Sequence, residues 1–180
     1  MVSQEMAVTA FFPLYRHHCV LHDRDGDVWL FQERLDNGSD PRYTLRGKTL
    51  SSGPRYTAYL FGNFKCDYQS NRISVFIEDV ITSKQGKLLG TWMLNRLIEF
   101  LRTAGKTVQY EEIYGDFKPR NEQQALTFFS RFGFVKRLLP TGREKITCGI
   151  GELHLVPIGD LKEIDFQEIV REWHVAKFGE

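Results

Sequence analysis

The sequence contains little cysteine, and its three cysteines are widely spaced. Cys19, Cys66 and Cys148 form no CxxC pair, so the sequence does not indicate a disulfide framework. Reduced thiols are typical of the cytoplasm, and we predict a cytoplasmic protein.

Long apolar runs and an excess of one charge are also lacking. No apolar run approaches the length of a membrane span, and Met1 to Ala10 does not have a basic region followed by an apolar core. Lys and Arg number 24 against 23 Asp and Glu, a net charge of +1. Because no overall field favours nucleic acid or an anionic surface, we predict neither a nucleic-acid nor a membrane partner.

What is present is an ordinary globular composition. The chain has 180 residues, of which 42% are hydrophobic, enough for a substantial core. Pro, Gly and Ser are scattered rather than gathered into a linker. We therefore expect one domain that spans residues 1–180.

The first half of the chain is rich in predicted strands. Apolar, aromatic and β-branched residues fill short runs, and Asp25-Gly26 is a strong hairpin signal. The predicted strands are Cys19–His22, Val28–Gln32, Tyr43–Leu50, Arg55–Phe64 and Arg72–Ile81. We expect these strands to form an antiparallel meander.

The second half changes its hydrophobic period. Leu89, Met93, Leu97 and Leu101 recur at helical spacing. The predicted elements are helices at Leu88–Arg102, Asn121–Phe132 and Leu161–Phe178, and strands at Val108–Tyr114, Phe134–Leu139 and Ile146–Val156. A strand–helix–strand succession requires a parallel pair. We therefore predict an α/β fold with a mixed, mostly antiparallel sheet that contains a parallel strand pair.

A glycine-containing turn lies between the predicted strand at Arg72–Ile81 and the helix that follows it. Unpaired N–H groups at a helix start can bind an anion without any particular side chain. The turn at Gln85 to Thr91 is therefore a candidate phosphate site, to which Lys84 and Lys87 would add charge.

Residues 55–139 resemble the GCN5-related N-acetyltransferase superfamily, which transfers acyl groups from acetyl-coenzyme A to amines. The cofactor loop is similar to Gln85-Gly86-Lys87-Leu88-Leu89-Gly90, except that Leu88 stands where the family has glycine. The family also has a second signature, and this chain has a similar set of residues: Asn121, Ala125, Phe128-Phe129 and Gly133-Phe134. Glu122 stands where the family places its Asn. Phe129 replaces a common Tyr that protonates the departing thiolate.

The resemblance implies an acyl-CoA N-acyltransferase-like fold, in which the central parallel strand pair is splayed and flanked by helices. It also implies acetyl-CoA as co-substrate and no metal. The implied cofactor-binding residues are Val80, Ile81, Gln85, Gly86, Lys87, Leu88, Leu89, Gly90, Thr91, Asn121 and Phe128. The family's two helices between its first strands have no counterpart here, so the acceptor side is expected to be rebuilt. The acceptor is a small-molecule or protein amine, and a homodimer is left open.

Acyl transfer needs a carboxylate or a water chain to take a proton from the amine. Glu78 is our candidate base and Asp79 the second candidate; alternation predicts that they face opposite sides of a strand. Apolar neighbours would raise the pKa of such a carboxylate, whereas pairing with an arginine would give it a structural role instead. Glu111 and Glu112 are reserve candidates, and Tyr114 or Tyr110 is a candidate acid.

Two other functions stay open. Leu88, Phe129 and the reduced acceptor side are compatible with an inactive acyl-CoA-binding or protein-interaction module. An α/β nucleic-acid binder is weaker, because no Lys/Arg stripe accompanies Tyr56, Tyr59, Phe61 and Phe64. We predict direct attack of the amine without a covalent intermediate, since no Cys or Ser has an evident activating partner.

Overall fold

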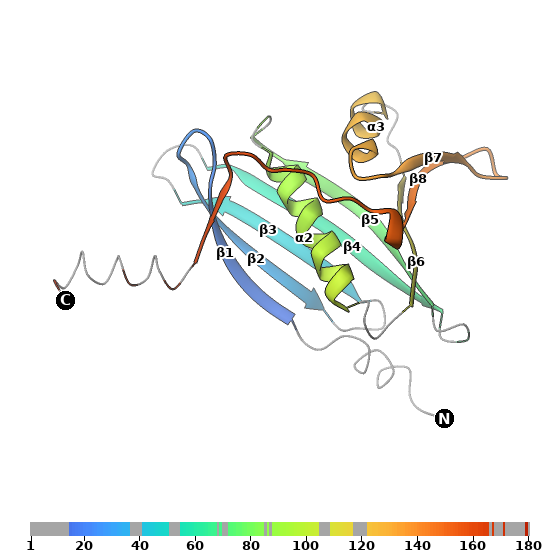
Figure 1. Cartoon of the computed structure of the whole chain (residues 1–180), viewed down its shortest axis with the longest axis horizontal. Coiled ribbons are helices and arrows are strands. Elements are labelled where there is room, and N and C mark those ends of the chain that lie inside the picture. The colour runs from blue at the N-terminus through green and yellow to red at the C-terminus, as the bar shows by residue number, and fades with distance from the viewer. Residues whose placement is uncertain are drawn as a thin grey trace.

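The strands form a single mixed sheet (Figure 1). The computed structural model describes residues 15–36, 41–50, 55–67, 69, 72–84, 86, 88–104, 109–116, 122–165, 167, 171 and 179. The strands are β1 (Tyr15–His22), β2 (Val28–Asp36), β3 (Arg42–Thr49), β4 (Thr57–Asp67), β5 (Arg72–Thr82), β6 (Gln109–Asp116), β7 (Val135–Leu138), β8 (Glu144–Gly149) and β9 (Lys162–Ile164). They lie in the order β7-β8-β6-β5-β4-β3-β2-β1-β9.

Helix α2 (Leu89–Ala104) lies across one face of this sheet (Figure 1). Its apolar stripe is fully buried at Met93, Leu94, Leu97, Ile98 and Leu101. The stripe packs into the core over the sheet, as the helical spacing predicted. A second helix, α3 (Glu122–Ser130), precedes β7, and a short 3-10 helix, η2 (Ile150–Glu152), follows β8.

The strand directions confirm the predicted fold class. Strands β1 to β5 pair antiparallel in sequence order, and β5 and β6 run parallel on either side of α2 in the chain. The predicted hairpin turn is present between β1 and β2, where the Gly26 amide donates to the Asp23 carbonyl at 3.0 Å. Gly26 has φ +82°, which glycine adopts without strain.

Two elements near the C-terminus differ from the prediction. The strand expected at Ile146–Val156 ends at Gly149, and the helix expected from Leu161 is wrong at its start. Lys162–Ile164 forms β9, which pairs antiparallel with β1. Helical periodicity could not reveal that an open edge of β1 was available to this segment. Within the rest of the predicted helix the structure describes Gln167 and Arg171, both helical.

The segment between η2 and β9 runs over α2 towards the β1 edge (Figure 1). The Asn95 side chain donates to the Val156 carbonyl at 2.7 Å and accepts from the Val156 amide at 3.0 Å. Arg102 donates to the Leu153 carbonyl at 2.8 Å. These bonds hold the segment across the helix. None of the helices in the described residues is long and apolar enough to cross a membrane.

Candidate functional site

Strands β5 and β6 part near the middle of β5. Their pairing ends at Ile77 and Gly115, after which β6 continues beside β8 through Asp116. Strand β5 instead continues beside β4, as far as the pairing of Thr82 with Ala58. Within the described residues, the last five residues of β5 therefore have no partner in β6, which confirms the predicted splay.

A cavity of about 520 Å³ lies where the two strands part. Its walls come from the end of β5, the start of α2 and the inner side of α3. Phe128 of α3 lies close to α2, since a Cβ on Gly90 would stand 3.6 Å from the Phe128 ring. The cavity is long enough to reach from a helix N-terminus to the gap between the strands.

Most of the predicted site residues that the structure describes line this cavity. They are Glu78, Asp79, Val80, Gly86, Leu88, Leu89, Gly90, Thr91 and Phe128. Ile81 is 40% exposed and is not among the lining residues. Gln85, Lys87 and Asn121 lie outside the described residues, as do the side chains of Tyr110 and Glu111.

The first residues of α2 line the cavity, and within the described part of the chain their amides have no hydrogen-bond partner. The first bond of the helix runs from the Trp92 amide to the Leu88 carbonyl at 2.9 Å. The amides of Leu89, Gly90 and Thr91 precede that bond, and N–H groups in this position have no partner within a helix. A diphosphate would find donors and the positive end of the helix dipole here.

Leu88 holds a backbone conformation that suits glycine. Its φ is +60°, and it is the one non-glycine residue of the described chain with positive φ. The left-handed region costs an L-residue about 1–2 kcal/mol. The departure from the glycine of the family motif therefore leaves the loop geometry intact but strained. The Leu88 side chain is half-buried beside Gly159, with Cδ1 3.7 Å from where a Cβ would stand.

We expect Leu88→Gly to be more stable than Leu88→Ala by about 1 kcal/mol, because both lose the side chain but only glycine relieves the left-handed strain. Leu88→Gly should also bind acetyl-CoA more tightly than Leu88→Ala. Chemical denaturation and calorimetric titration of the two variants measure these differences. Equal stability would show that the positive φ carries no strain.

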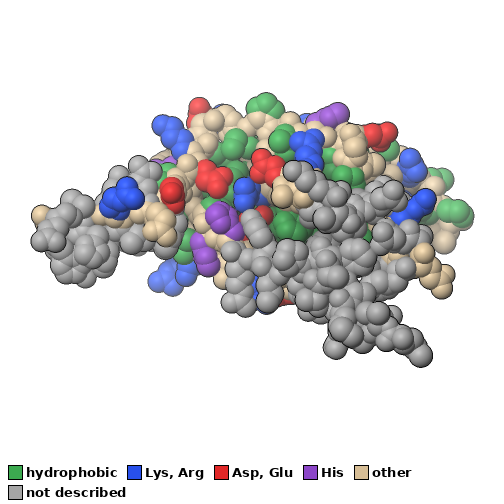
Figure 2. All heavy atoms as spheres, turned by 60° about the horizontal axis from the view of Figure 1, so that its bottom comes forward, with side chains coloured by type: hydrophobic (Ala, Val, Ile, Leu, Met, Phe, Trp, Pro, Cys, Tyr) green, Lys and Arg blue, Asp and Glu red, His purple; other side chains and the backbone are tan. Residues whose placement is uncertain are grey.

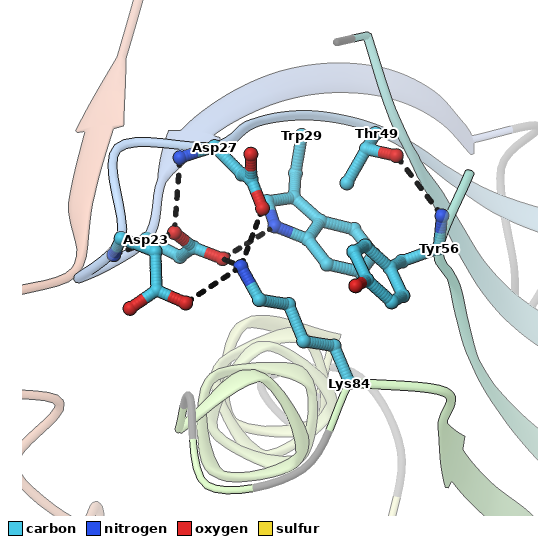
Figure 3. Close-up of polar contacts among 7 residues, drawn as sticks. Asp23, Asp27, Trp29, Thr49, Tyr56 and Lys84 are labelled. Carbon is cyan, nitrogen blue, oxygen red and sulfur yellow. Dashed lines mark hydrogen bonds and ion pairs between the residues drawn. The ribbon is translucent and has the colours of Figure 1, made fainter. Parts of the chain in front are cut away.

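Lys84, in the loop before α2, is held by the β1–β2 turn (Figure 3). Its ammonium group contacts Asp23 at 2.9 Å, Asp25 at 3.0 Å and also Asp27. The side chain is only 11% exposed. Lys84 also lines the cavity, but three carboxylates already contact its ammonium group, so its added charge for a phosphate stays a prediction.

The same cluster fixes the turn itself. Asp23 accepts from the indole N–H of Trp29 at 3.0 Å and from the amides of Asp25 and Asp27. Burial alone would raise the pKa of Asp23, but the hydrogen bonds from Lys84 and Trp29 hold it below its usual value. Burial would lower the pKa of Lys84, but hydrogen bonds to the aspartates raise it. Both shifts favour the charged forms of Asp23 and Lys84 at neutral pH, and their contact ties the loop before α2 to the β1–β2 hairpin.

Glu78 sits at a β-bulge in β5. Phe61 of β4 pairs with Asp79 and its neighbour Gly62 pairs with Ile77, which leaves Glu78 as the extra residue. The side-chain amide of Asn63 donates a hydrogen bond to the Glu78 carboxylate at 3.2 Å. Asn63 lies on the same face of β4 as Phe61, because the two are separated by one residue in the strand. The prediction that Glu78 and Asp79 face opposite sides is therefore wrong, since a bulge breaks strict alternation. Both carboxylates lie on the sheet face opposite α2.

The surroundings of Glu78 also differ from the expectation. Its side chain is 42% exposed and pairs with Arg42, with Nη2 and Oε2 at 2.5 Å. This is the arginine pairing that was the structural alternative to a catalytic role, and the role of Glu78 as base stays a prediction. The prediction that apolar residues surround this carboxylate is therefore wrong. At the bulge, Glu78 points away from the face that carries the buried residues of β5. Glu78 nevertheless lines the cavity, so it is positioned at the point where the two strands part.

Tyr114 and Glu112 line a different, shallower cavity of about 380 Å³. The Nζ of Lys65 and that of Lys145 lie 5.6 and 4.9 Å from the centre of the Tyr114 ring. Glu112 bonds to Lys145 at 2.9 Å and to the Thr147 hydroxyl. Although burial would raise the pKa of Glu112, these bonds lower it. The structure does not bring Tyr114 into the first cavity, and its acid role stays a prediction.

The two cysteines whose side chains are described are poor nucleophiles. Cys19 and Cys148 are buried. Burial, with a contribution from Glu163, raises the pKa of Cys19 to about 12, and burial also raises the pKa of Cys148. Since the thiolate is the nucleophile, neither of these residues is suited to form a covalent intermediate.

Sequence reasoning missed the residues that surround Glu78. Arg42 comes from β3 and Asn63 from β4, both distant from Glu78 in the chain. No local signal identifies them, because their approach depends on the register of three strands. The only signal in the sequence was the prediction of neighbouring strands at Tyr43–Leu50 and Arg55–Phe64. The first of these excludes Arg42, which precedes Tyr43.

Charges of both signs are interspersed in the described part of the surface that Figure 2 shows. This agrees with the balanced composition of the chain.

No family model and no curated protein matches this chain. Among solved structures, it is similar to the KacTA–DNA complex, with 18% identity over 61% of this chain and 69% of that one and a TM-score of 0.45. It is similar to a mutant AtaT toxin bound to the C-terminus of the antitoxin AtaR and acetyl-CoA, with 16% identity, the same coverages and a TM-score of 0.44. It is also similar to nourseothricin acetyltransferase, with 14% identity over 82% and 92% of the two chains and a TM-score of 0.39.

At these identities no residue role passes from those proteins to this chain. The order of its strands, the parallel pair β5–β6 and their parting beside the start of α2 are features of its own coordinates. They give the chain the α/β fold that was predicted, a mixed and mostly antiparallel sheet with one parallel pair and helices beside it.

Proposed function

We propose that the protein transfers an acetyl group from acetyl-CoA to a primary amine by direct attack. The observation that carries this proposal is the cavity between the start of α2 and the gap where β5 and β6 part. Such a site suits an acyl carrier that has a diphosphate and a long, thin thioester arm. The diphosphate needs amide donors, and the thioester arm needs a gap between the strands of the sheet.

In this proposal the amides of Leu89, Gly90 and Thr91 hold the diphosphate. The free edges of β5 beyond Ile77 and of β6 near Gly115 border the thioester arm. Glu78 and Asp79 lie on the far face of the sheet, so the acceptor approaches from that side. Main-chain donors therefore bind the carrier, and carboxylates act on the acceptor.

Glu78 accepts a proton from the ammonium group of the acceptor, directly or through a water molecule. The neutral nitrogen then forms a bond to the acyl carbon, while the carbon–sulfur bond breaks and its electron pair leaves with sulfur. The second nitrogen proton ends on the thiol. A thiol with pKa near ~8.5 needs little help to leave, whereas positioning can contribute about 7–11 kcal/mol, so Phe129 in place of a tyrosine is compatible with turnover.

Calorimetric titration with acetyl-CoA tests the cofactor site. Ala125 lines the cavity, whereas Thr127 is exposed on the same helix. We expect Ala125→Trp to abolish binding by filling the cavity, and Thr127→Trp, a substitution to the same side chain, to bind as the unmodified protein does. Binding that is equally strong in both variants, or absent from the unmodified protein, would overturn the proposal.

A second candidate is a non-catalytic acyl-CoA-binding module, favoured by Phe129, which lines the cavity and has no proton to donate. The two functions differ in one measurement. Tight acetyl-CoA binding with no thiol release on any amine, peptides included, would favour the module.

A further inference from the structure

Two arginines converge on one aromatic ring on the sheet face opposite α2. The guanidinium carbon of Arg42 lies 4.5 Å from the centre of the Phe61 ring, and that of Arg46 lies 5.3 Å from it. Both arginines belong to β3, and the residue between them, Thr44, is the register partner of Phe61. Strand alternation therefore places both guanidinium groups and the ring on one face.

These arginines have unused capacity to bind an anion. The Nε of Arg42 is buried and has no hydrogen-bond partner among the described residues. Arg46 has no carboxylate within ion-pair distance in the described part of the chain. Guanidinium groups bind carboxylates and phosphates with two parallel hydrogen bonds. The face thus offers a pair of cations with donors to spare.

The pair lies directly beside the proposed base. Arg42 contacts Glu78, and Phe61 is the register partner of Asp79. Arg42 and Glu78 are 40% and 42% exposed, and ion pairs this exposed stabilise a protein little. An incoming anion can therefore replace Glu78 on Arg42 at small cost.

We propose that Arg42 and Arg46 recognise an anionic group on the acceptor, which is a primary amine carrying a carboxylate or phosphate within a few bonds of its nitrogen. This rests on the proposed function. The acceptor's anion takes the place of the Glu78 carboxylate on Arg42, and the released carboxylate then accepts the ammonium proton. The contact between Arg42 and Glu78 sets the distance between the anion and the nitrogen of the acceptor. The anion must reach Arg42 while the nitrogen reaches Glu78, and these two side chains are adjacent.

Two matched pairs of amines test the proposal in a thiol-release assay. One pair is phosphoethanolamine and ethanolamine, and the other is β-alanine and its amide. We expect kcat/KM to be about 10- to 100-fold higher for at least one anionic member than for its neutral partner. The pair that shows the difference distinguishes phosphate from carboxylate. Equal rates within both pairs would overturn the proposal.

Variants assign the preference to these side chains. Arg42→Gln and Arg46→Gln should bring the ratio of anionic to neutral substrate towards one. Lys48→Gln is the control, because Lys48 lies on the same face of β3, two residues beyond Arg46, and is exposed. It should keep the ratio. Loss of the ratio in Lys48→Gln to the same extent would show that only the general charge of the face matters.

Binding separates failure of this proposal from failure of the proposed function. Titration of phosphoethanolamine and β-alanine without acetyl-CoA should show binding of the preferred anion that Arg42→Gln weakens by about tenfold or more. If acetyl-CoA does not bind but this anion does, the transferase function fails and the anion site stands. If acetyl-CoA binds and neither anion does, the anion site fails alone.

Discussion

Replacing Glu78 by glutamine is expected to lower kcat by about 10²- to 10⁴-fold, the usual contribution of a general base. The amide keeps the shape of the side chain but cannot take the ammonium proton. The affinity for acetyl-CoA should not change, because the proposed function places the diphosphate at the start of α2 and not on the acceptor face. Thiol-release kinetics with the best amine, and calorimetric titration of acetyl-CoA, measure the two quantities.

Glu112→Gln is the matched control for this prediction. Glu112 lies on the neighbouring β6, lines the second cavity and pairs with Lys145. Its replacement should leave kcat within about twofold. If Glu78→Gln retains full turnover across the pH range, Glu78 is not the base. Asp79→Asn then becomes the decisive variant, because the bulge brings Asp79 to the same face.

Replacing Arg96 by methionine is expected to lower the free energy of unfolding by about 3–5 kcal/mol, because it breaks a buried ion pair by removing one member. Arg96 of α2 contacts Glu33 of β2 at 2.7 Å, and Glu33 is only 1% exposed. The hydroxyl of Tyr43 also donates to Glu33. Denaturant unfolding measures the loss, and the melting temperature should fall by roughly 2–4 °C for each kcal/mol.

Arg34→Met is the control, because it removes the same group from an exposed ion pair. Arg34 and Asp36 are both 44% exposed, and such pairs contribute about 0–1 kcal/mol. In the double variant Arg96→Met with Glu33→Leu, stability should partly recover, because no buried charge remains. Equal losses for Arg34→Met and Arg96→Met would show that burial of Glu33 does not decide the cost.

The turn and helix start beside the cavity could be predicted from the sequence because their signals are local. The turn, the N-terminus of α2 and the apolar stripe lie within one continuous segment, Thr82 to Leu101. Periodicity and turn composition report on such a segment directly. The prediction for the start of the C-terminal helix was wrong because the deciding interaction is not local. Strand β9 forms there because β1, which is distant in the chain, offers an edge for pairing.

The side-chain contacts around Glu78 could not be predicted in this way. Residues from β3, β4 and β5 meet there, and the pairing of Phe61 with Asp79 and of Gly62 with Ile77 decides which side chains face each other. A single inserted residue at Glu78 reverses the alternation that follows it. Lys84 shows the same limit, because its partners Asp23 and Asp27 lie about sixty residues away in the chain.

The sequence by itself determined strands β1 to β8, α2 and α3, the parallel pair and the start of α2, because hydrophobic period and turn chemistry act over a few neighbouring residues. Only the tertiary structure decided that Glu78 bulges towards Arg42, that three aspartates hold Lys84, and that two arginines share the Phe61 ring. Those contacts depend on strand register, and register is set by the packing of the whole sheet rather than by any one segment.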